Sequence, residues 1–379
     1  MRKDVYISGY NCITPLGFDA ESNWRALAEG KSGVCFTQPA DSREAFYVSA
    51  ISNERLKAEF EKQFPGQHAS RLEKMLLLSL KPLAERHTIS ENTALIVSTT
   101  KGNISLLKNQ PALPEGVFLS GMAQKIAAFF GFKTKPVVVS NACVSGVMAI
   151  AVAKNMIRTG KYKDAFVIAG DEVSEFVLSG FNSFQALADG PCRPYDKNRN
   201  GINLGEAAAA VYMTSEPDGN EQFSFKVSGD SAINDANHIS GPSRTGDGLF
   251  ASIRNAMDEA QVSSEDIDFI SAHGTATLYN DEMECIAFHR MDMQHIPLNS
   301  MKGYYGHTLG ASGLLESIMA MESALKNMLI PSKNFKDPGT SQPLNIIKEN
   351  KTADIRYILK TASGFGGCNA AVVLEKTLN

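Results

Sequence analysis

One cysteine occupies a position suited to nucleophilic catalysis. Cys143 lies in PVVVSNACVSGVMAIAVAKNMI, residues 136–157, where a β-branched run gives way to small polar residues and then to an apolar helical run. The free N–H groups and the dipole of a helix N-terminus stabilise a thiolate, so we expect an activated thiol. Gly146 would let the start of this helix approach another backbone closely. The competing interpretation is a small buried residue at the end of a strand.

Two histidines have a similar setting. His273 in SAHGTA follows a strand-like run, and His307 in GYYGHTLGASG lies in a glycine-rich loop before an apolar helix. Loops that follow strands carry catalytic groups in α/β folds. An isolated histidine is more commonly a structural residue, but two histidines and a cysteine in equivalent loops predict a shared site.

A lysine and a glutamate accompany His307. Lys302 lies in the same loop, and Glu316 lies on the nearly apolar helix GLLESIMAM that follows. Such a helix is expected to bury Glu316. A buried carboxylate requires a partner, which Lys302 or a histidine can supply. The alternative is that both charges lie on a solvated surface.

A glycine-rich turn precedes the last strand-like run. In TASGFGGCNAAVVLE, Gly364, Gly366 and Gly367 enclose Phe365. Glycines permit a sharp turn, and such a turn can direct N–H groups at a reacting oxygen. A plain tight turn is the simpler interpretation of this segment taken alone.

The elements around these loops predict an α/β fold. Short β-branched runs such as TALIVSTT and DAFVIAGDE alternate with helical runs, which is typical of a mostly parallel, buried sheet. Residues 89–103 resemble 263–277, and residues 136–152 resemble 296–321, so the chain looks internally duplicated. The polar segment 213–223 is the expected boundary. A duplicated α/β unit places its site at the seam between the halves.

Composition narrows the class of protein. The chain has 379 residues, 43% hydrophobic and 21% charged, with a formal net charge of -4. It has no basic tract for nucleic acid and no apolar run long enough to span a bilayer. The N-terminus lacks a signal-peptide core, so we expect a cytoplasmic protein. The six cysteines form no CxxC pair, which argues against a disulfide framework, and no ligand cluster suggests a metal or a redox cofactor.

Six motifs in order resemble those of a known enzyme family. They are similar to the motifs of the elongating, type II β-ketoacyl-[acyl carrier protein] synthases, members of the thiolase-like superfamily. The motifs are VYISGYNCITPLG, SNACVSG, PCRPYDKNRNGINLGEAAAA, AHGTATLYNDEMECIA, KGYYGHTLGASGLLE and SGFGGCNAAVVLE. The resemblance implies two duplicated α/β halves, expected at 1–220 and 221–379, that form a five-layer αβαβα sandwich.

The resemblance also implies an acyltransferase reaction. Cys143 would take an acyl chain from the phosphopantetheine of an acyl carrier protein. Malonyl carrier protein would then lose CO2, and its enolate would attack the thioester, with no metal or redox cofactor. His273 and His307 would stabilise the enolate. A homodimer is implied, with a heterodimer as the alternative.

The same resemblance assigns the supporting residues. Lys302 would orient the histidines, and Glu316 would anchor Lys302. The N–H groups of Cys143 and Phe365, in the turn with Gly364 and Gly366, would form the oxyanion hole. The family's starter-condensing relatives carry one His and one Asn, whereas both positions are His here, which fits the elongating branch.

Several positions depart from the family pattern. Ser363 replaces a Phe beside the catalytic cysteine, and Ile202 replaces another Phe, so we expect a changed substrate pocket. The region 103–123 looks shorter than usual. Together these departures suggest a specialised fatty-acid, polyene or polyketide pathway. The other departures are Ala207, Ala209, Ala276 and Cys368.

Two further functions stay open at this point. A noncatalytic chain-length or partner subunit of a condensing heterodimer would fit Ser363 and the short 103–123 region, although the intact Cys143 argues against it. A thiolase or thioester hydrolase that uses coenzyme A would fit GHTLGASG. The paired histidines favour condensation.

Overall fold

The computed structural model describes residues 3–38, 44–107, 113–217, 223–236 and 241–378. The strands of the first half are β1 (Tyr6–Ile13), β2 (Cys35–Thr37), β3 (Phe46–Ser49), β4 (Thr93–Ser98), β5 (Val137–Val139), β6 (Asp164–Asp171), β7 (Leu204–Gly205) and β8 (Ala207–Thr214). Its helices are α1 (Ala20–Ala28), α2 (Asn53–Gln63), α3 (Arg71–Arg86), α4 (Leu119–Phe130), α5 (Ser145–Arg158) and α6 (Glu175–Ser183).

The second half also consists of strands and helices that alternate along the chain. Its strands are β9 (Phe223–Asn234), β10 (Phe269–Ser271), β11 (Leu298–Asn299), β12 (Met328–Leu329), β13 (Lys351–Thr352), β14 (Tyr357–Gly364) and β15 (Cys368–Leu378). Its helices are α7 (Asp247–Ala260), α8 (Leu278–Arg290), α9 (Lys302–Tyr305) and α10 (Ser312–Leu325).

The large sheet confirms the predicted duplication. Its strand order is β11-β10-β14-β15-β9-β1-β8-β6-β4-β5. Each half contributes five strands to this sheet. When these five are ranked by their order along the chain and read from the outer edge of the sheet to its middle, both halves have the same spatial order: third, second, fourth, fifth, first. In both halves, the first three strands in this order are parallel to one another, and the next strand is antiparallel to its neighbours on both sides. The halves join where β1 pairs with β9. The expected boundary at 220 stays a prediction, since residues 218–222 lie outside the described residues.

The expectation of a mostly parallel sheet was wrong. Strands β8 and β15 run antiparallel to both of their neighbours. In β8 all but one residue is buried, so the strand reads as a continuous apolar run. A strand covered on both faces has this pattern whichever way it runs, because burial and not direction sets its composition.

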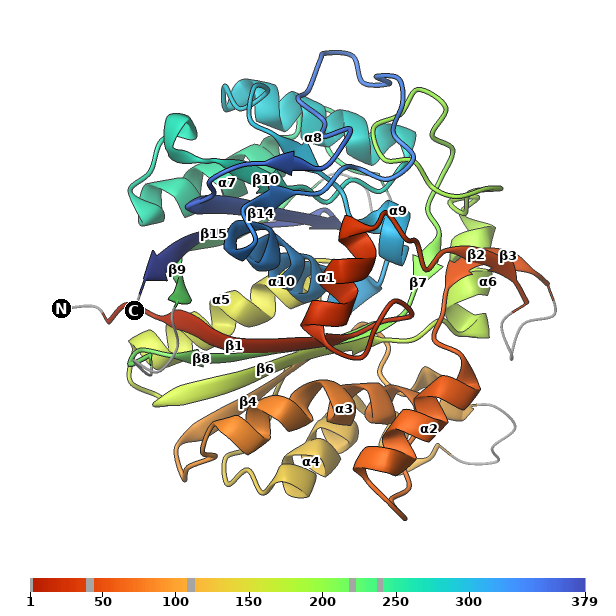
Figure 1. The fold of residues 1–379 in the computed structure, drawn as a ribbon, viewed down its shortest axis with the longest axis vertical. Helices are drawn as coiled ribbons and strands as arrows, with labels where there is room; N and C mark the ends of the chain where they lie inside the picture. Colours follow the sequence, from red (N-terminus) through yellow and green to blue (C-terminus); the bar gives the residue numbers. More distant parts are fainter. Residues whose placement is uncertain (1–2, 39–43, 108–112, 218–222, 237–240, 379) are drawn as a thin grey trace.

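The layers follow the expected order α-β-α-β-α (Figure 1). Helices α3 and α4 cover the outer face of the first half's sheet, and α7 and α8 cover the outer face of the second. Helices α5 and α10 lie between the two halves of the large sheet, where they contribute to the largest hydrophobic core. The central layer is therefore covered on both sides, which accounts for the burial of every residue of α10 from Ser312 to Ala324.

Two glycines let the central helices touch. A Cβ atom on Gly146 would lie 2.6 Å from the backbone nitrogen of Leu314, and one on Gly313 would lie 2.7 Å from that of Val147. Only glycine permits such an approach, as expected for Gly146. The contact brings together the amino-terminal ends of α5 and α10, which follow Cys143 and His307.

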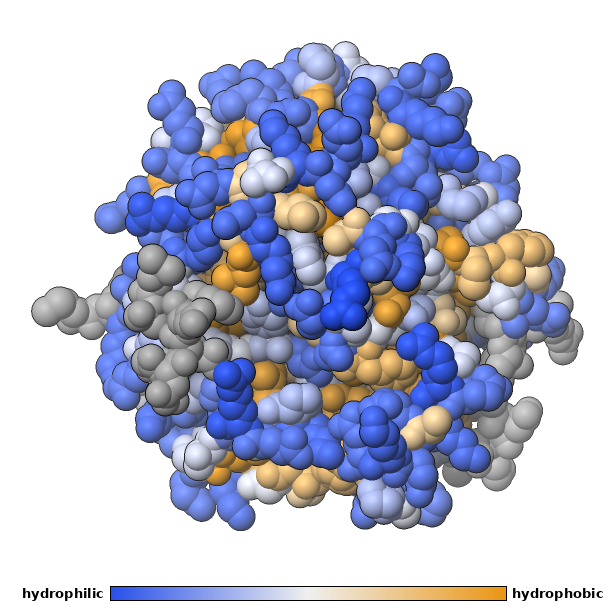
Figure 2. Space-filling model, viewed as in Figure 1, coloured by the Kyte–Doolittle hydropathy of each residue, from blue (hydrophilic) through white to orange (hydrophobic). Residues whose placement is uncertain are grey.

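The surface is mainly hydrophilic in the view of Figure 2, with hydrophobic side chains gathered near the β2–β3 hairpin. Phe36 there is 63% exposed and its ring centroid lies 5.1 Å from that of Tyr47. Among the described residues, no helix has the length and apolar character to cross a membrane. The expected shortening of 103–123 is untested, and its residues 108–112 lie outside the described part of the chain.

Candidate active site

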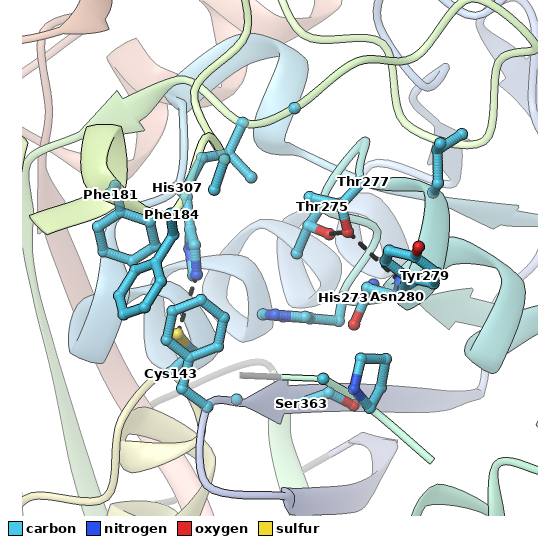
Figure 3. A pocket seen from close by; sticks show the side chains of 18 of the residues that line it. Cys143, Phe181, Phe184, His273, Thr275, Thr277, Tyr279, Asn280, His307 and Ser363 are labelled. Atoms are coloured by element: carbon cyan, nitrogen blue, oxygen red, sulfur yellow. Dashed lines mark hydrogen bonds between the residues drawn. The ribbon is translucent and has the colours of Figure 1, made fainter. Parts of the chain in front are cut away.

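Cys143 lies where the sequence predicted, directly before α5. It is 8% exposed, and the preceding residue, Ala142, has a left-handed backbone with φ of 44°. A residue other than glycine pays for this conformation in strain, which is common beside functional groups. The bend turns the Cys143 side chain toward His307, whose Nε2 atom lies 3.0 Å from the Sγ atom (Figure 3).

Burial changes the expected charge of the nucleophile. We expected the helix terminus to favour a thiolate, but burial raises the pKa of Cys143 to about 12. Burial, followed by the ammonium group of Lys302, lowers the pKa of His307 to about 3. The resting pair is therefore a neutral thiol and a neutral imidazole. The expected free thiolate is corrected to a neutral thiol that lies within hydrogen-bond distance of His307 Nε2.

A chain of hydrogen bonds sets the tautomer of His307. The Oγ atom of Ser312 lies 3.4 Å from His307 Nδ1 and donates to Glu316 Oε1 at 3.1 Å. Since the hydroxyl proton is used on Glu316, the contact with Nδ1 requires that Nδ1 carry a proton. The lone pair of Nε2 then faces the Cys143 thiol, as a general base requires.

His273 has the opposite tautomer. Its ring centroid lies 5.3 Å from that of His307, at 80°. The Nζ atom of Lys302 lies 3.4 Å from His273 Nδ1, and an ammonium group can only donate. Nδ1 is therefore the acceptor and Nε2 carries the proton. Burial, followed by Lys302, lowers the pKa of His273 well below its ordinary value, so the ring is a neutral donor.

Lys302 and Glu316 lie behind the histidines, both buried as expected for Glu316. Lys302 Nζ donates to Glu316 Oε1 at 2.8 Å and to the carbonyl oxygen of His273 at 2.7 Å. Burial alone would favour the protonated carboxyl, but the lysine partners outweigh it and lower the pKa of Glu316 to about 2. The carboxylate thus holds Lys302 against the loop that carries His273.

The turn between β14 and β15 closes over Cys143. A Cβ atom on Gly364 would lie 3.0 Å from the backbone nitrogen of Cys143. Gly366 and Gly367 have φ of 88° and 77°, so both need glycine. Gly367 lines the cavity beside Cys143, whereas Gly366 serves the turn without lining it. Phe365 lines the cavity as well.

A cavity of about 580 Å³ opens onto Cys143 and both histidines. Ser363 and Ile202, the two predicted pocket residues, line it. Ser363 Oγ donates to Asn369 Oδ1 at 2.8 Å, and Asn369 Nδ2 donates to Asp235 at 3.0 Å. The hydrogen-bonded side chains of Ser363 and Asn369 therefore form a buried polar part of the cavity wall, where the family pattern has an aromatic ring.

Two adjoining parts of the chain match the two domains of one protein family. Residues 2–218 match the family described as "Beta-ketoacyl synthase, N-terminal domain", and residues 225–336 match "Beta-ketoacyl synthase, C-terminal domain". The chain belongs to the β-ketoacyl synthase family. It is similar to 3-oxoacyl-[acyl-carrier-protein] synthase 2 of Staphylococcus aureus (strain COL), with 25% identity over 411 residues that cover 99% of this chain and 99% of that protein.

Solved structures share the fold of this synthase. A chain of a ketosynthase in complex with its chain length factor from Xenorhabdus doucetiae has a TM-score of 0.87 and 23% identity, covering 99% of this chain and 98% of that one. The ishigamide ketosynthase/chain length factor has a TM-score of 0.87 and 24% identity, covering 99% of both chains. These likenesses confirm the thiolase-like architecture.

Sequence reasoning missed a second lysine in the synthase site. Lys360, in β14, is fully buried, and its Nζ atom donates to Glu316 Oε2 at 2.6 Å. A lysine in the apolar run YILKTAS was the available signal, because a lysine is rarely buried without a carboxylate partner. Ser312 was missed too, although it lies within a quoted motif.

Sequence reasoning also missed the aromatic wall of the synthase cavity. The ring of Phe365 stacks on Phe181, with centroids 5.6 Å apart at 23°, and meets Phe184 edge-on at 5.6 Å and 78°. Figure 3 shows Phe181 and Phe184 on the same side of the site as Cys143 and His307. Both phenylalanines come from α6 and its end, far from Phe365 in sequence, so no local pattern indicated this cluster.

Proposed function

We propose that this protein is a β-ketoacyl-[acyl carrier protein] synthase that uses Cys143 as its acyl acceptor. The observation that carries the proposal is the contact between Cys143 Sγ and His307 Nε2, with His273 lining the same cavity and its ring centroid 5.3 Å from that of His307. This arrangement provides a nucleophile, a base and a neutral hydrogen-bond donor at one point.

The first step transfers an acyl chain. Sγ of Cys143 attacks the carbonyl carbon of the acyl thioester while its proton moves to Nε2 of His307. The bond between that carbon and the carrier's sulfur breaks, and the departing thiolate takes the proton. Concerted transfer suits a thiol whose pKa burial raises to about 12. The N–H groups of Cys143 and Phe365 are proposed to bind the oxyanion.

The second step forms the carbon–carbon bond. The malonyl carboxylate leaves as CO2, and the electron pair moves into an enolate whose oxygen the Nε2–H of His273 stabilises. The enolate carbon attacks the Cys143 thioester, the C–S bond breaks, and the Cys143 thiolate takes up a proton from water. The net positive charge behind the site favours these anions. The proposed reaction uses no metal or redox cofactor.

We also propose the setting of this reaction. Ser363 and the aromatic wall around Phe365 favour a specialised fatty-acid, polyene or polyketide pathway, since they alter the pocket. Acyl carrier protein is the proposed substrate donor. All six cysteines, each within the described ranges, are free thiols, which fits a reducing cytoplasm.

A homodimer is the proposed assembly, and a heterodimer is the second candidate. Solved structures with the same fold include ketosynthases in complex with a chain length factor. A noncatalytic subunit of such a pair is therefore the second candidate function. The contact between Cys143 and His307 supports the catalytic role, because a subunit without chemistry has no need of it.

Intact-mass analysis tests the proposal. The protein is mixed with acyl carrier proteins that carry short, long, unsaturated or aromatic chains, and the adduct is mapped by peptide analysis. We expect acylation at Cys143 and, after malonyl carrier protein is added, release of a β-ketoacyl product. A folded protein that no chain acylates, but that binds a second synthase subunit, would support the partner role instead.

A further inference from the structure

Two lysines share one carboxylate behind the active site. Lys302 Nζ donates to Oε1 of Glu316 at 2.8 Å, and Lys360 Nζ donates to Oε2 at 2.6 Å. All three side chains are almost inaccessible to solvent. Within this trio two ammonium groups share one carboxylate, so the three groups together carry a positive charge in a poorly solvated place, and Glu284 of α8 is the further carboxylate that acts on Lys360.

Lys360 also fixes the strand that leads to His273. Its Nζ atom donates to the carbonyl oxygen of Ser271 at 3.0 Å and to that of Ala272 at 3.3 Å. Lys302 binds the next carbonyl, that of His273, at 2.7 Å. Three consecutive carbonyl groups at the end of β10 are thus held by two lysines, both anchored on one carboxylate.

The excess charge acts on the histidines. After the larger effect of burial, Lys302 and Lys360 both disfavour protonation of His273 and His307, whereas the carboxylate of Glu316 favours protonation of His307 and partly offsets the lysines there. Burial lowers the pKa of Lys360 itself, and the carboxylate of Glu316 opposes that shift. Lys302 lowers the pKa of Lys360 further, and Glu284 of α8, which accepts from the backbone N–H of His273 at 2.8 Å, opposes that shift as Glu316 does.

We propose that Lys360 is a positioning residue of the condensing site, which holds Glu316 and the end of β10 in place and keeps His273 and His307 uncharged. Lys302 alone would satisfy the charge of Glu316. The second ammonium group adds the positive potential that favours an enolate and an uncharged imidazole donor. The inference rests on the proposed function for its catalytic consequence, but not for its effect on the histidines.

The test compares Lys360→Met with Lys154→Met. Lys154 is also buried, and its Nζ atom binds Asp230 and Glu259 at 2.7 Å each, in an ion pair between α5, β9 and α7. Its loss removes a comparable buried ion pair outside the cavity that opens onto Cys143. Lys360→Gln, which keeps a donor for the carbonyls of Ser271 and Ala272, replaces Lys360→Met if that variant does not fold.

Imidazole NMR titration of His273 and His307 is the first readout. Loss of Lys360 should raise the pH at which the two rings take up a proton by about one unit, the size of one charge acting over several ångström at an effective dielectric constant of about 20. Lys154→Met should leave both titrations unchanged. An unchanged titration in the Lys360 variants, or an equal shift in Lys154→Met, would overturn the inference.

Steady-state condensation is the second readout. Lys360→Met should lower kcat about tenfold without a change in KM for malonyl carrier protein, since Lys360 does not line the cavity. A changed KM with an unchanged kcat would contradict the proposed role. If the wild-type protein shows no condensation while the titrations shift as expected, the proposed function fails and the role of Lys360 in setting the histidines stands.

Discussion

The Nε2 atom of His307 lies 3.0 Å from the Sγ atom of Cys143, although the residues are 164 positions apart in the chain. The contact exists because Gly146 and Gly313 let α5 and α10 meet at their amino-terminal ends. Helix α5 begins two residues after Cys143, and α10 begins five residues after His307. The proposed pairing of nucleophile and base therefore depends on how closely two backbones approach.

Replacement of the nucleophile separates the two steps. Cys143→Ala should give no acyl adduct and no condensation, because no other group in the cavity can form the thioester. Cys143→Gln should resemble the acylated site and keep release of CO2 from malonyl carrier protein. Adduct formation is followed by intact mass and CO2 release by a coupled assay. Condensation by Cys143→Ala would contradict the mechanism.

Loss of the Ser312 hydroxyl should disturb the tautomer of His307. Without the acceptor at Nδ1, the ring can place its proton on Nε2, where it no longer accepts from Cys143. We expect Ser312→Ala to slow acylation about tenfold, with a changed nitrogen chemical shift of the His307 ring. Ser317→Ala, which removes a hydroxyl that donates to Gly313 at 2.7 Å on the same helix, is the matched control.

A methyl group on Gly364 should push the closing turn away from Cys143. The added Cβ would lie 3.0 Å from both the Cys143 nitrogen and the Cys368 sulfur. We expect Gly364→Ala to fold but to slow acylation about a hundredfold, which is the typical effect of removing one oxyanion donor. Gly180→Ala in α6, where a Cβ meets nothing within 4 Å, is the control. Equal acylation rates for the two variants would contradict the proposed role of this turn in binding the oxyanion.

An aromatic ring at position 363 should change substrate choice. Ser363→Phe replaces the hydrogen bond to Asn369 with a ring that fills part of the cavity, so we expect a preference for shorter acyl chains. Ser363→Ala removes the same hydrogen bond without adding volume and should keep the wild-type preference. Competition between carriers of different chain length measures the outcome. An unchanged product profile in Ser363→Phe would refute the argument about the pocket.

Acid should weaken the fold through Glu316. Its pKa is about 2 in the folded protein against an ordinary value of 4.5, so the ionised carboxylate stabilises the fold above pH 4.5 and this contribution is lost as the pH falls toward 2. Glu316→Gln should lower the unfolding free energy at neutral pH by about 3 kcal/mol. Urea unfolding at several pH values should show a smaller loss on acidification for Glu316→Gln than for the wild type.

Much of the site was predictable because its chemistry is local in sequence. The loops of small residues around Cys143, His273 and His307 indicate the ends of strands. The apolar residues around Glu316 predict that its carboxylate is buried. Lys360 was harder to find, because its role depends on β14 lying beside β10. The left-handed backbone of Ala142 likewise follows from the packing of α5 and not from the identity of an alanine.

The residue types of the site, the α/β alternation and the duplication could be predicted from the chain alone, because burial and turn chemistry leave local patterns. Tertiary structure alone decided strand direction, since β8 and β15 are covered on both faces and read alike in either direction. It also decided the charge of Cys143, because burial at the seam outweighs the helix terminus. The aromatic wall of the cavity also depends on tertiary structure, since Phe181 and Phe365 come into contact only after the two halves pack together.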